Sequence, residues 1–312
     1  MRDNATPSIS VIIPTFNRAT WLRQAMASAL RQSCGDFELI VVDDASTDAT
    51  RELVANVGDP RVRYLRHDRN RGAAVAKNTG IGAARGGFIA FLDDDDEWLP
   101  AKLEKQLAKF NTSPAGVGVV YAGSSVVSER SGRTVHSFTV YAREFTEVDF
   151  LRTVPFTTSV PLLRKTCVLE AGLFDESLPG AQDRDLWIRL TRHCAFEFVP
   201  EILVRRYIHG EQITTNLKAK IAAKEIICRK YHDVLSRHPD LLADHLHRLG
   251  MLYCLDGRTA RGLSCFWQAI RQAPTRRTLY KDLALTLATP RRHRQTLLAT
   301  RIETVDGIRL YY

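Results

Sequence analysis

The stretch that most constrains this chain is a short apolar run that ends in four consecutive carboxylates. Phe88 to Leu92 has the composition of a buried strand, and Asp93 to Asp96 follow it without a break. Four like charges in a row repel one another, so a cation or water must offset that repulsion. Ligands bind at the carboxyl ends of strands in open α/β sheets, and hard divalent cations prefer carboxylate oxygens. We therefore favour a divalent metal site over a solvated loop at this position.

The N-terminal part of the chain alternates strands with helices. We expect strands over residues 8–13, 37–42, 62–65 and 88–92, and helices over residues 20–30, 49–56, 72–84 and from residue 100 onward. Pro14 is expected to stop the first strand. Four strand–helix repeats are typical of a parallel α/β sheet, so the polar residues that follow the strands should meet at one edge of that sheet.

Three of the four expected strands end in polar or acidic residues, which makes these residues candidates for a ligand site. They are Thr15 and Asn17 after the first strand, Asp43 and Asp44 after the second, and Asp93 to Asp96 after the fourth. Asp44 and Asp48 each have the alternative role of capping a helix. Taken together, three polar strand ends at one crevice favour a ligand site.

Standard nucleotide-binding motifs are missing from the sequence. The chain has no G-x-x-x-x-G-K-[ST] motif, and the Gly-Ile-Gly of residues 80–82 is followed by Arg85 where a dinucleotide fingerprint has its third glycine. Phosphates must then be held in another way. We expect them to be held by a metal ion on the carboxylates of Asp93 and Asp95.

Beyond residue 112 the pattern is less regular. We expect a strand over residues 117–127, a loop or hairpin over 130–150, an extended segment over 156–163, a helix over 181–190, and strands over 196–199 and 202–207. Asp183 and Asp185 lie in the first turn of the expected helix, where the helix dipole favours acidic residues. The same position suits a catalytic carboxylate, so both interpretations stay open.

The last third of the chain differs from the rest in charge and in pattern. Residues 214–312 hold 18 Lys and Arg against 8 Asp and Glu, an excess of +10, while the rest of the chain balances to −1. Residues 216–312 lack strand signals, and residues 246–274 resemble one tetratricopeptide-like helix pair. Basic clusters at residues 276–277 and 291–294 are interpreted as solvated helix ends, or as contacts with an anionic membrane surface. Nucleic-acid binding is a less favoured alternative, because no nucleic-acid fold signal accompanies the clusters.

Composition places the chain among soluble globular proteins of one large or two smaller domains, with 312 residues, 45% hydrophobic and 25% charged. The six cysteines are scattered and form no C-x-x-C pair, which fits a reducing compartment and signals no zinc site. The N-terminus lacks a signal-peptide core, and no apolar run approaches the length of a membrane span. We expect a cytoplasmic protein whose basic C-terminal region provides any peripheral contact with the inner face of a membrane.

The order of these motifs resembles that of the family 2 glycosyltransferases. The segments that carry the resemblance, over roughly residues 8–215, are Ser10 to Arg18 (SVIIPTFNR), Val41 to Asp48 (VVDDASTD), Asn70 to Gly72 (NRG), Lys77 to Ile81 (KNTGI), Phe91 to Trp98 (FLDDDDEW), Gly172 to Glu176 (GLFDE) and Gln182 to Trp187 (QDRDLW). The run of four acids resembles the D-x-D metal motif of the family. Each motif alone is weak, but their occurrence in the family's order is specific.

The resemblance implies a GT-A fold over residues 1–215, which is a nucleotide-diphospho-sugar transferase fold with a Rossmann-like, mostly parallel sheet. A helical C-terminal region over residues 216–312 is expected to follow it. The implied activity is an inverting transfer of a sugar from a nucleotide-diphospho-sugar, with a UDP-sugar favoured, to a hydroxyl of a glycan or lipid-linked acceptor. Surface polysaccharide biosynthesis is the expected setting, and the oligomeric state is left open.

The resemblance also implies roles for individual residues. Asp44 is expected to bind the nucleotide base, Asp95 to hold Mn²⁺ or Mg²⁺ on the diphosphate, and Asp183 to act as the general base. The other expected contacts with donor or metal are Pro14, Thr15, Asn17, Lys77, Asp93, Asp94, Gln182 and, as a third metal ligand, His209. Elementary chemistry agrees, because a metal neutralises a leaving diphosphate and a carboxylate near the acceptor hydroxyl takes up its proton.

Several of these assignments have alternatives. Where the family has Glu-Asp this chain has Gln182-Asp183, so a non-catalytic sugar-nucleotide-binding or scaffold protein is the alternative to an active enzyme. Asp94 stands where the family often has a small residue, and either strengthens metal binding or sits in water. Lys77 either contacts phosphate as a point charge or lies on a solvated helix face. His209 is either a ligand or an ordinary core or surface histidine.

Overall fold

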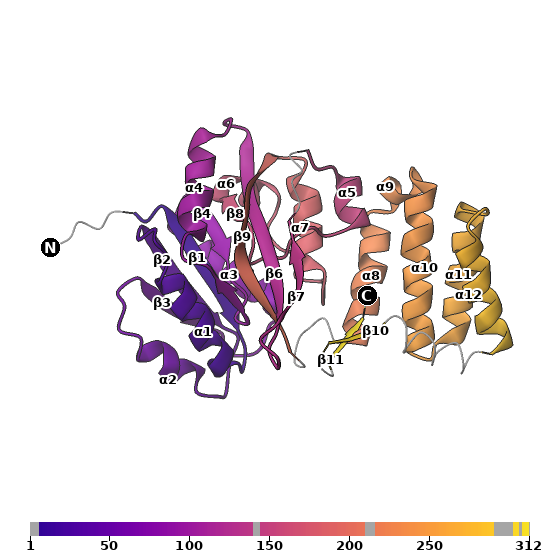
Figure 1. The fold of residues 1–312 in the computed structure, drawn as a ribbon, viewed down its shortest axis with the longest axis horizontal. Coiled ribbons are helices and arrows are strands. Elements are labelled where there is room, and N and C mark those ends of the chain that lie inside the picture. The colour runs from indigo at the N-terminus through magenta and orange to yellow at the C-terminus, as the bar shows by residue number, and fades with distance from the viewer. Residues whose placement is uncertain (1–5, 140–143, 210–215, 290–301, 306–307, 312) are drawn as a thin grey trace. The chain divides into compact units, whose positions relative to one another are not determined.

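The computed structural model describes residues 6–139, 144–209, 216–289, 302–305 and 308–311 (Figure 1). The chain divides into two compact units. One contains residues 1–176 and 182–207, and the other contains residues 177–181 and 208–312. Each unit has its own clusters of buried hydrophobic side chains.

The first unit is built on one mixed sheet (Figure 1). Its strands are β1 (Ile9–Thr15), β2 (Phe37–Asp43), β3 (Val62–Arg66), β4 (Phe88–Phe91), β5 (Asp96–Trp98), β6 (Val117–Ser128), β7 (Thr134–Phe138), β8 (Leu162–Arg164) and β9 (Ala195–Ile208). They lie in the order β3-β2-β1-β4-β8-β6-β9-β5, and β7 pairs with β6 beside this path. Strands β1 to β4 are parallel, whereas the pairings of β8 with β4 and β6, of β7 with β6, and of β5 with β9 are antiparallel.

Seven helices in the described part of this unit cover the sheet. They are α1 (Ala19–Leu30), α2 (Thr50–Ala55), α3 (Ala73–Ala83), α4 (Lys102–Thr112), α5 (Glu147–Arg152), α6 (Lys165–Glu170) and α7 (Gln182–Leu190). Helix α3 packs against β1 and β2, and α1 packs against β5. Strands β1 and β2 are buried along their whole length, as expected for parallel strands covered on both faces. The four predicted strand–helix repeats are therefore present.

Strand β1 continues through Pro14, so the prediction that this proline stops the strand is wrong. The amide of Leu92 donates to the carbonyl of Ile12, which shows that the backbone groups of even-numbered residues in β1 face β4. Strand β4 pairs with β1 only as far as Ile12. The N–H that Pro14 lacks would therefore have no strand partner, and proline is accepted there. The strand ends at Thr15, at the carboxyl end of the parallel strands.

The antiparallel half of the sheet departs further from the sequence predictions. Residues 96–98 form β5 although two of them are acidic and have low β propensity. The two strands expected over residues 196–199 and 202–207 are one strand, β9, which continues through the exposed Pro200. The loop or hairpin expected over residues 130–150 is only partly correct. Strand β7 pairs with β6, which lies before that range, and residues 147–152 form helix α5 behind a capping box of Thr146 and Asp149.

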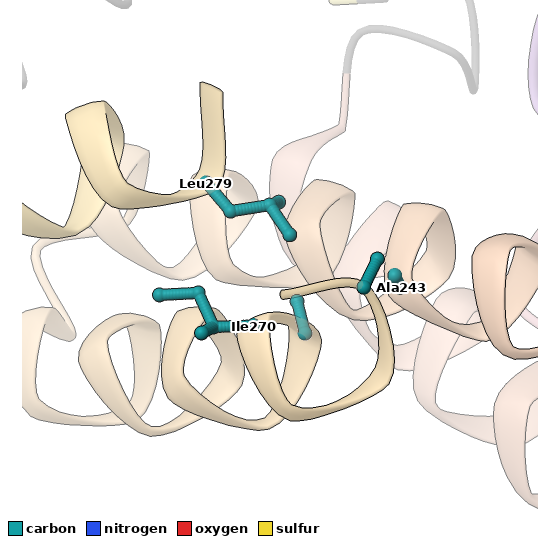
Figure 2. Close-up of a cluster of buried hydrophobic side chains, with 5 residues drawn as sticks. Ala243, Ile270 and Leu279 are labelled. Atoms are coloured by element: carbon teal, nitrogen blue, oxygen red, sulfur yellow. The ribbon is translucent and has the colours of Figure 1, made fainter. Parts of the chain in front are cut away.

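The second unit consists mainly of helices. They are α8 (Leu217–Lys230), α9 (His232–Ser236), α10 (Pro239–Leu255), α11 (Thr259–Gln272) and α12 (Arg277–Ala288). The helix pair expected over residues 246–274 corresponds to α10 and α11, which pack against each other. Figure 2 shows Ala243 of α10, Ile270 of α11 and Leu279 of α12 in one buried cluster. This cluster joins the three helices.

The expectation that residues 216–312 lack strands is wrong. Strands β10 (Ile302–Val305) and β11 (Ile308–Tyr311) pair as a two-stranded antiparallel sheet. The signal was present in the sequence, because two runs rich in alternating apolar residues flank Asp306-Gly307, a dipeptide typical of hairpin turns. Within the described parts of the chain, no helix is long and apolar enough to cross a membrane.

Candidate active site

The four carboxylates after β4 do not share one environment. The chain turns sharply there, with the amide of Asp96 donating to the carbonyl of Asp93 over 3.0 Å. The side chains are stabilised by several neighbours, so the repulsion expected from the sequence is offset locally. The charge on three of them is balanced by two cationic side chains from elsewhere in the fold, Lys77 and Arg18.

Asp93 is held by Lys77 and by the segment before β8. The Lys77 Nζ lies 3.1 Å from Oδ1 of Asp93, and the Thr158 hydroxyl donates to Oδ2 over 2.7 Å. The backbone amide of Asp93 donates to the Ser159 hydroxyl over 3.0 Å. Lys77 is only 7% exposed, so the alternative of a solvated helix face is wrong. Thr158 and Ser159 were not singled out in the sequence, because an extended Thr-Thr-Ser segment carries no motif.

Asp94 and Asp95 share the guanidinium group of Arg18. The Arg18 Nη1 donates to Oδ1 of Asp94 over 3.0 Å and to Oδ2 of Asp95 over 3.1 Å. The Thr15 hydroxyl donates to the other oxygen of Asp94 over 2.8 Å. Asp94 is 5% exposed, so the alternative that it sits in water is wrong. The sequence did not indicate that Arg18 pairs with these acids, although Arg18 is the last residue of the SVIIPTFNR motif.

Burial dominates the electrostatics of this pair of acids. Burial raises the pKa of the Asp94 carboxyl to about 6, against the opposing effect of Arg18 and with a contribution from Asp95. Burial alone would lower the pKa of Arg18, but Asp94 and Asp95 more than compensate and the net shift is upward. Arg18 therefore stays charged beside both acids.

Asp96 is part of the sheet, unlike the three acids before it. It is the first residue of β5 and is 6% exposed. Burial raises the pKa of its carboxyl well above the usual range, with Asp95 adding to the shift and Arg206 opposing it. Asp94 and Asp96 are buried, whereas the side chains of Asp93 and Asp95 are 31% and 12% exposed. The carboxylate oxygens of Asp93 and Asp95 are therefore the ones best placed to contact a ligand.

Asp44 is buried and fixes the loop that leads into α3. Its Oδ1 lies 2.7 Å from Nδ1 of His67 and accepts a hydrogen bond from the Arg71 amide over 2.8 Å. Its Oδ2 accepts from the Gly72 amide over 2.7 Å. Gly72 has φ 92°, which only glycine adopts without strain. Asp44 thus fixes the backbone that leads into α3, whereas Asp48 accepts a hydrogen bond from the amide of Thr50, the first residue of α2.

Asn17 ties the loop after β1 to the loop after β2. Its amide donates to the Ser46 hydroxyl over 2.9 Å, and its side-chain oxygen accepts from the Thr47 amide over 2.7 Å. Its φ of 53° lies in the left-handed region, which asparagine tolerates better than most residues. The predicted donor-binding residues Thr15, Asn17 and Asp44 therefore lie at neighbouring strand ends, as the parallel topology requires.

A cavity opens at the carboxyl end of β3, next to Asp44. It has a volume of about 580 Å³ and is lined by Arg66, His67, Asp68, Arg69 and Arg71. Because His67 and Arg71 both contact Asp44, the cavity adjoins the residue to which the family resemblance assigns the nucleotide base. Three arginines give this cavity a positive lining.

Helix α7 presents Asp183 at its first turn. Asp185 is fully buried and paired with Arg189, with 2.8 Å between Oδ2 and Nη2, so its role is structural. Asp183 is half-buried, and its Oδ1 accepts a hydrogen bond from the Arg184 amide over 2.8 Å. Gln182 is the first residue of α7 and is half-buried. Of the two acids in the helix, Asp183 is thus the candidate for chemistry.

Two of the sequence motifs are joined by one side chain. Asn78 of α3 donates through Nδ2 to the carbonyl of Phe174 over 3.0 Å, and its Oδ1 accepts from the Phe174 amide over 3.0 Å. Its Nδ2 also donates to Glu176 over 3.0 Å. Asn78 therefore fixes the Gly172–Glu176 segment against α3, a role that the sequence did not indicate.

His209 follows β9 and is buried. It belongs to the second compact unit, and its proposed contact with a metal remains a prediction. Among the described residues, no group of three or more His, Cys, Asp or Glu side chains is arranged to hold a metal ion. Asp93 and Asp95 still fit a metal that completes its shell with phosphate and water, because Mg²⁺ sites commonly use only one or two carboxylates beside substrate phosphates.

Comparison with known proteins identifies the family. A family model described as glycosyl transferase family 2 matches residues 10–165. The Escherichia coli K12 protein WcaA, named as a colanic acid biosynthesis glycosyl transferase, is 30% identical over 247 residues, which are 76% of this chain and 85% of WcaA. A Campylobacter jejuni GalNAc(5)-diNAcBac-PP-undecaprenol beta-1,3-glucosyltransferase is 32% identical over 214 residues, 67% of each protein. The chain belongs to glycosyltransferase family 2 and is a glycosyltransferase.

The chain spans about a third of some relatives. It is 32% identical to a Rickettsia felis glycosyltransferase over 221 residues, which are 66% of this chain and 35% of that protein. Among solved structures, S. aureus TarS 1–349 in complex with UDP-GlcNAc superposes with a TM-score of 0.60 at 17% identity, covering 98% of this chain and 96% of that chain. This likeness confirms the predicted GT-A fold with helices at its C-terminal end.

Proposed function

We propose that this glycosyltransferase is a metal-dependent inverting enzyme that takes its sugar from a nucleotide-diphospho-sugar. The observation that carries the proposal is the placement of Asp93 and Asp95 on one turn at the carboxyl edge of the parallel strands. Bound there, Mn²⁺ or Mg²⁺ would neutralise charge on the leaving nucleoside diphosphate. Asp93 and Asp95 are the residues that would hold it.

We assign the donor nucleotide to the strand ends of β1, β2 and β3. The cavity lined by Arg66, His67 and Arg71 has a positive lining that suits an anionic ligand, and it adjoins Asp44. Because Asp44 already accepts hydrogen bonds from two backbone amides, its effect on the nucleotide includes holding the loop of residues 67–72 in place. A UDP-sugar is favoured, and the complex of S. aureus TarS with UDP-GlcNAc supports that choice through the shared fold.

Asp183 acts as the general base in this proposal. Its half-buried carboxylate at the first turn of α7 takes the proton of the acceptor hydroxyl as the hydroxyl oxygen attacks the anomeric carbon. The bond from that carbon to the diphosphate oxygen breaks, and its electron pair leaves with the nucleoside diphosphate. A single displacement of this kind inverts the anomeric configuration.

The acceptor is proposed to be a hydroxyl of a glycan or of a lipid-linked sugar in surface polysaccharide biosynthesis. The name of E. coli WcaA supports a polysaccharide setting, and the name of the C. jejuni relative supports a lipid-linked acceptor. A cytoplasmic location, with the basic C-terminal region contacting the membrane, would bring the enzyme to such an acceptor.

The test is a panel of UDP-, GDP- and dTDP-sugars, each with Mn²⁺, with Mg²⁺ or with a chelator, read as nucleoside diphosphate released. Release that requires the metal supports the proposal and names the donor. Release that persists undiminished in chelator contradicts metal dependence. Gln182 is the feature that favours the second candidate, a sugar-nucleotide-binding protein without turnover, and metal-dependent binding without release in the presence of candidate acceptors would favour it.

A further inference from the structure

Arg18 contacts the carboxylate that a metal ion would need. The residue directly precedes α1, and its Nη1 lies 3.1 Å from Oδ2 of Asp95. The side chains of Arg18 and Asp95 are 19% and 12% exposed, so bulk water screens this pair only in part. A guanidinium group at this distance occupies one face of the Asp95 carboxylate. A divalent cation that approached the same oxygen would meet a fixed positive charge.

The same guanidinium has a second anchor that does not depend on Asp95. Its Nη1 also donates to Oδ1 of Asp94 over 3.0 Å, and Asp94 is more deeply buried and held by the Thr15 hydroxyl. If Asp95 turned toward a metal ion, Arg18 would keep its bond to Asp94. Arg18 would therefore still have a counter-ion after Asp95 exchanges it for a metal ion. The exchange needs only a rearrangement of the Asp95 side chain.

We propose that Arg18 is the internal counter-cation of Asp95 and makes metal binding depend on the donor diphosphate. The inference rests on the proposed function. In the donor-free enzyme Arg18 holds Asp95, and the metal ion alone binds weakly because it must compete with a positive charge. A metal ion that arrives with a diphosphate brings negative charge, which offsets Arg18 and lets Asp95 exchange its partner. Arg18 is thus a positioning residue that couples the two binding events.

Asp93 provides a useful contrast within the same turn. Its partner Lys77 is buried in α3 and also lies 3.4 Å from the Thr158 hydroxyl. Asp93 itself is 31% exposed and has a second partner in Thr158, so one of its oxygens is fixed independently of Lys77. Arg18 contacts Asp95 and Asp94 through the same Nη1 atom, so the guanidinium keeps Asp94 as its counter-ion when Asp95 turns to another partner.

The test measures Mn²⁺ binding to the full chain by the electron paramagnetic resonance signal of free Mn²⁺, alone and with UDP, GDP or dTDP, after correction for Mn²⁺ held by the nucleotide in solution. For the wild type, one nucleotide should raise the affinity for Mn²⁺ at least about tenfold. Arg18→Gln should raise the affinity for Mn²⁺ alone about tenfold, because the competing charge is gone, and should reduce the effect of the nucleotide to about threefold or less.

Arg23→Gln is the matched control. It removes one positive charge from an exposed position on α1 and should leave both affinities unchanged. An Arg18→Gln protein that folds and binds Mn²⁺ alone no better than the wild type would overturn the inference. The wild type offers a test without any variant, because equal affinity for Mn²⁺ with and without every nucleotide would also overturn it. Failure of the wild type to bind Mn²⁺ under any condition would instead refute the proposed metal dependence, and the inference with it.

Discussion

Lys77 and Asp93 form an ion pair that joins α3 to the end of β4, with 3.1 Å between Nζ and Oδ1. Only 8% of the lysine side chain is exposed, compared with 31% of the aspartate. The lysine therefore has its charge inside the fold, while its partner is partly exposed to solvent. This pair links the stability of the catalytic unit to the geometry of the proposed donor site.

Replacing Lys77 by Met should destabilise the protein and weaken donor binding. Removing one partner of a buried pair costs about 3–5 kcal/mol, and the partial exposure of Asp93 reduces our expectation to about 1–3 kcal/mol. Urea unfolding measures this loss, and Lys77→Arg is the matched control that keeps the charge. A Lys77→Met protein whose free energy of unfolding lies within about 0.5 kcal/mol of the wild type would show that the pair contributes little.

Replacing Lys102 by Met should stabilise the protein at pH 7. Lys102 is fully buried, its Nζ has no hydrogen-bond partner among the described residues, and it lies 4.0 Å from the centre of the Trp98 ring. Burial lowers the pKa of Lys102 well below its ordinary value. In the unfolded chain this amine is protonated below about pH 10.4. Folding must therefore remove a proton from it at any pH below that value at which the folded amine is neutral, and this opposes folding.

The expected gain from Lys102→Met is about 1–3 kcal/mol in the free energy of unfolding at pH 7. The gain should shrink as the pH rises toward the pKa of the unfolded lysine, because the unfolded state then gives up its extra proton. Urea unfolding at pH 7 and at pH 9.5 measures both values. A destabilised variant, or a gain that is the same at both pH values, would contradict this explanation.

Cys167 and Cys194 form a thiol pair beside Gly118. A side chain at Gly118 would overlap both sulfur atoms, which shows how closely they converge. A hydrogen bond from Cys194 lowers the pKa of the Cys167 thiol to about 7, although burial opposes the shift, and the pKa of Cys194 is raised. Replacing Cys194 by Ala should therefore raise the pKa of Cys167 by one unit or more.

The titration of Cys167 can be followed without chemical modification. The thiolate absorbs near 240 nm, so the difference in absorbance between each protein and its Cys167→Ser version reports on Cys167 alone. We expect a midpoint near pH 7 in the wild type and a higher midpoint in Cys194→Ala. Identical midpoints in both backgrounds would show that Cys194 does not stabilise the thiolate.

The sequence was most informative where the pattern is local. Alternating strands and helices predicted the parallel strands β1 to β4, and the polar residues after them indicated the sheet edge where Thr15, Asn17 and Asp44 meet. Strand β5 was not predicted, because Asp96 and Glu97 are poor strand formers. These residues form a strand only through their pairing with β9.

The environment of the acids could not be predicted, because their partners lie far away in the sequence. Arg18 reaches Asp94 from 76 residues upstream, and Thr158 reaches Asp93 from 65 residues downstream. No periodicity or motif spacing encodes such contacts. They arise when the topology brings the loop after β1 and the segment before β8 to the end of β4.

The most direct test of the proposed mechanism compares donor binding and turnover in Asp183→Asn. Asp240→Asn is the matched control, because Asp240 is an exposed acid in the first turn of α10. We predict that Asp183→Asn binds the nucleotide-sugar with Mn²⁺ as tightly as the wild type and loses at least about a hundredfold in transfer rate, since the base is missing while the donor contacts remain. A transfer rate near that of the Asp240→Asn control would contradict the assignment of Asp183 as the general base.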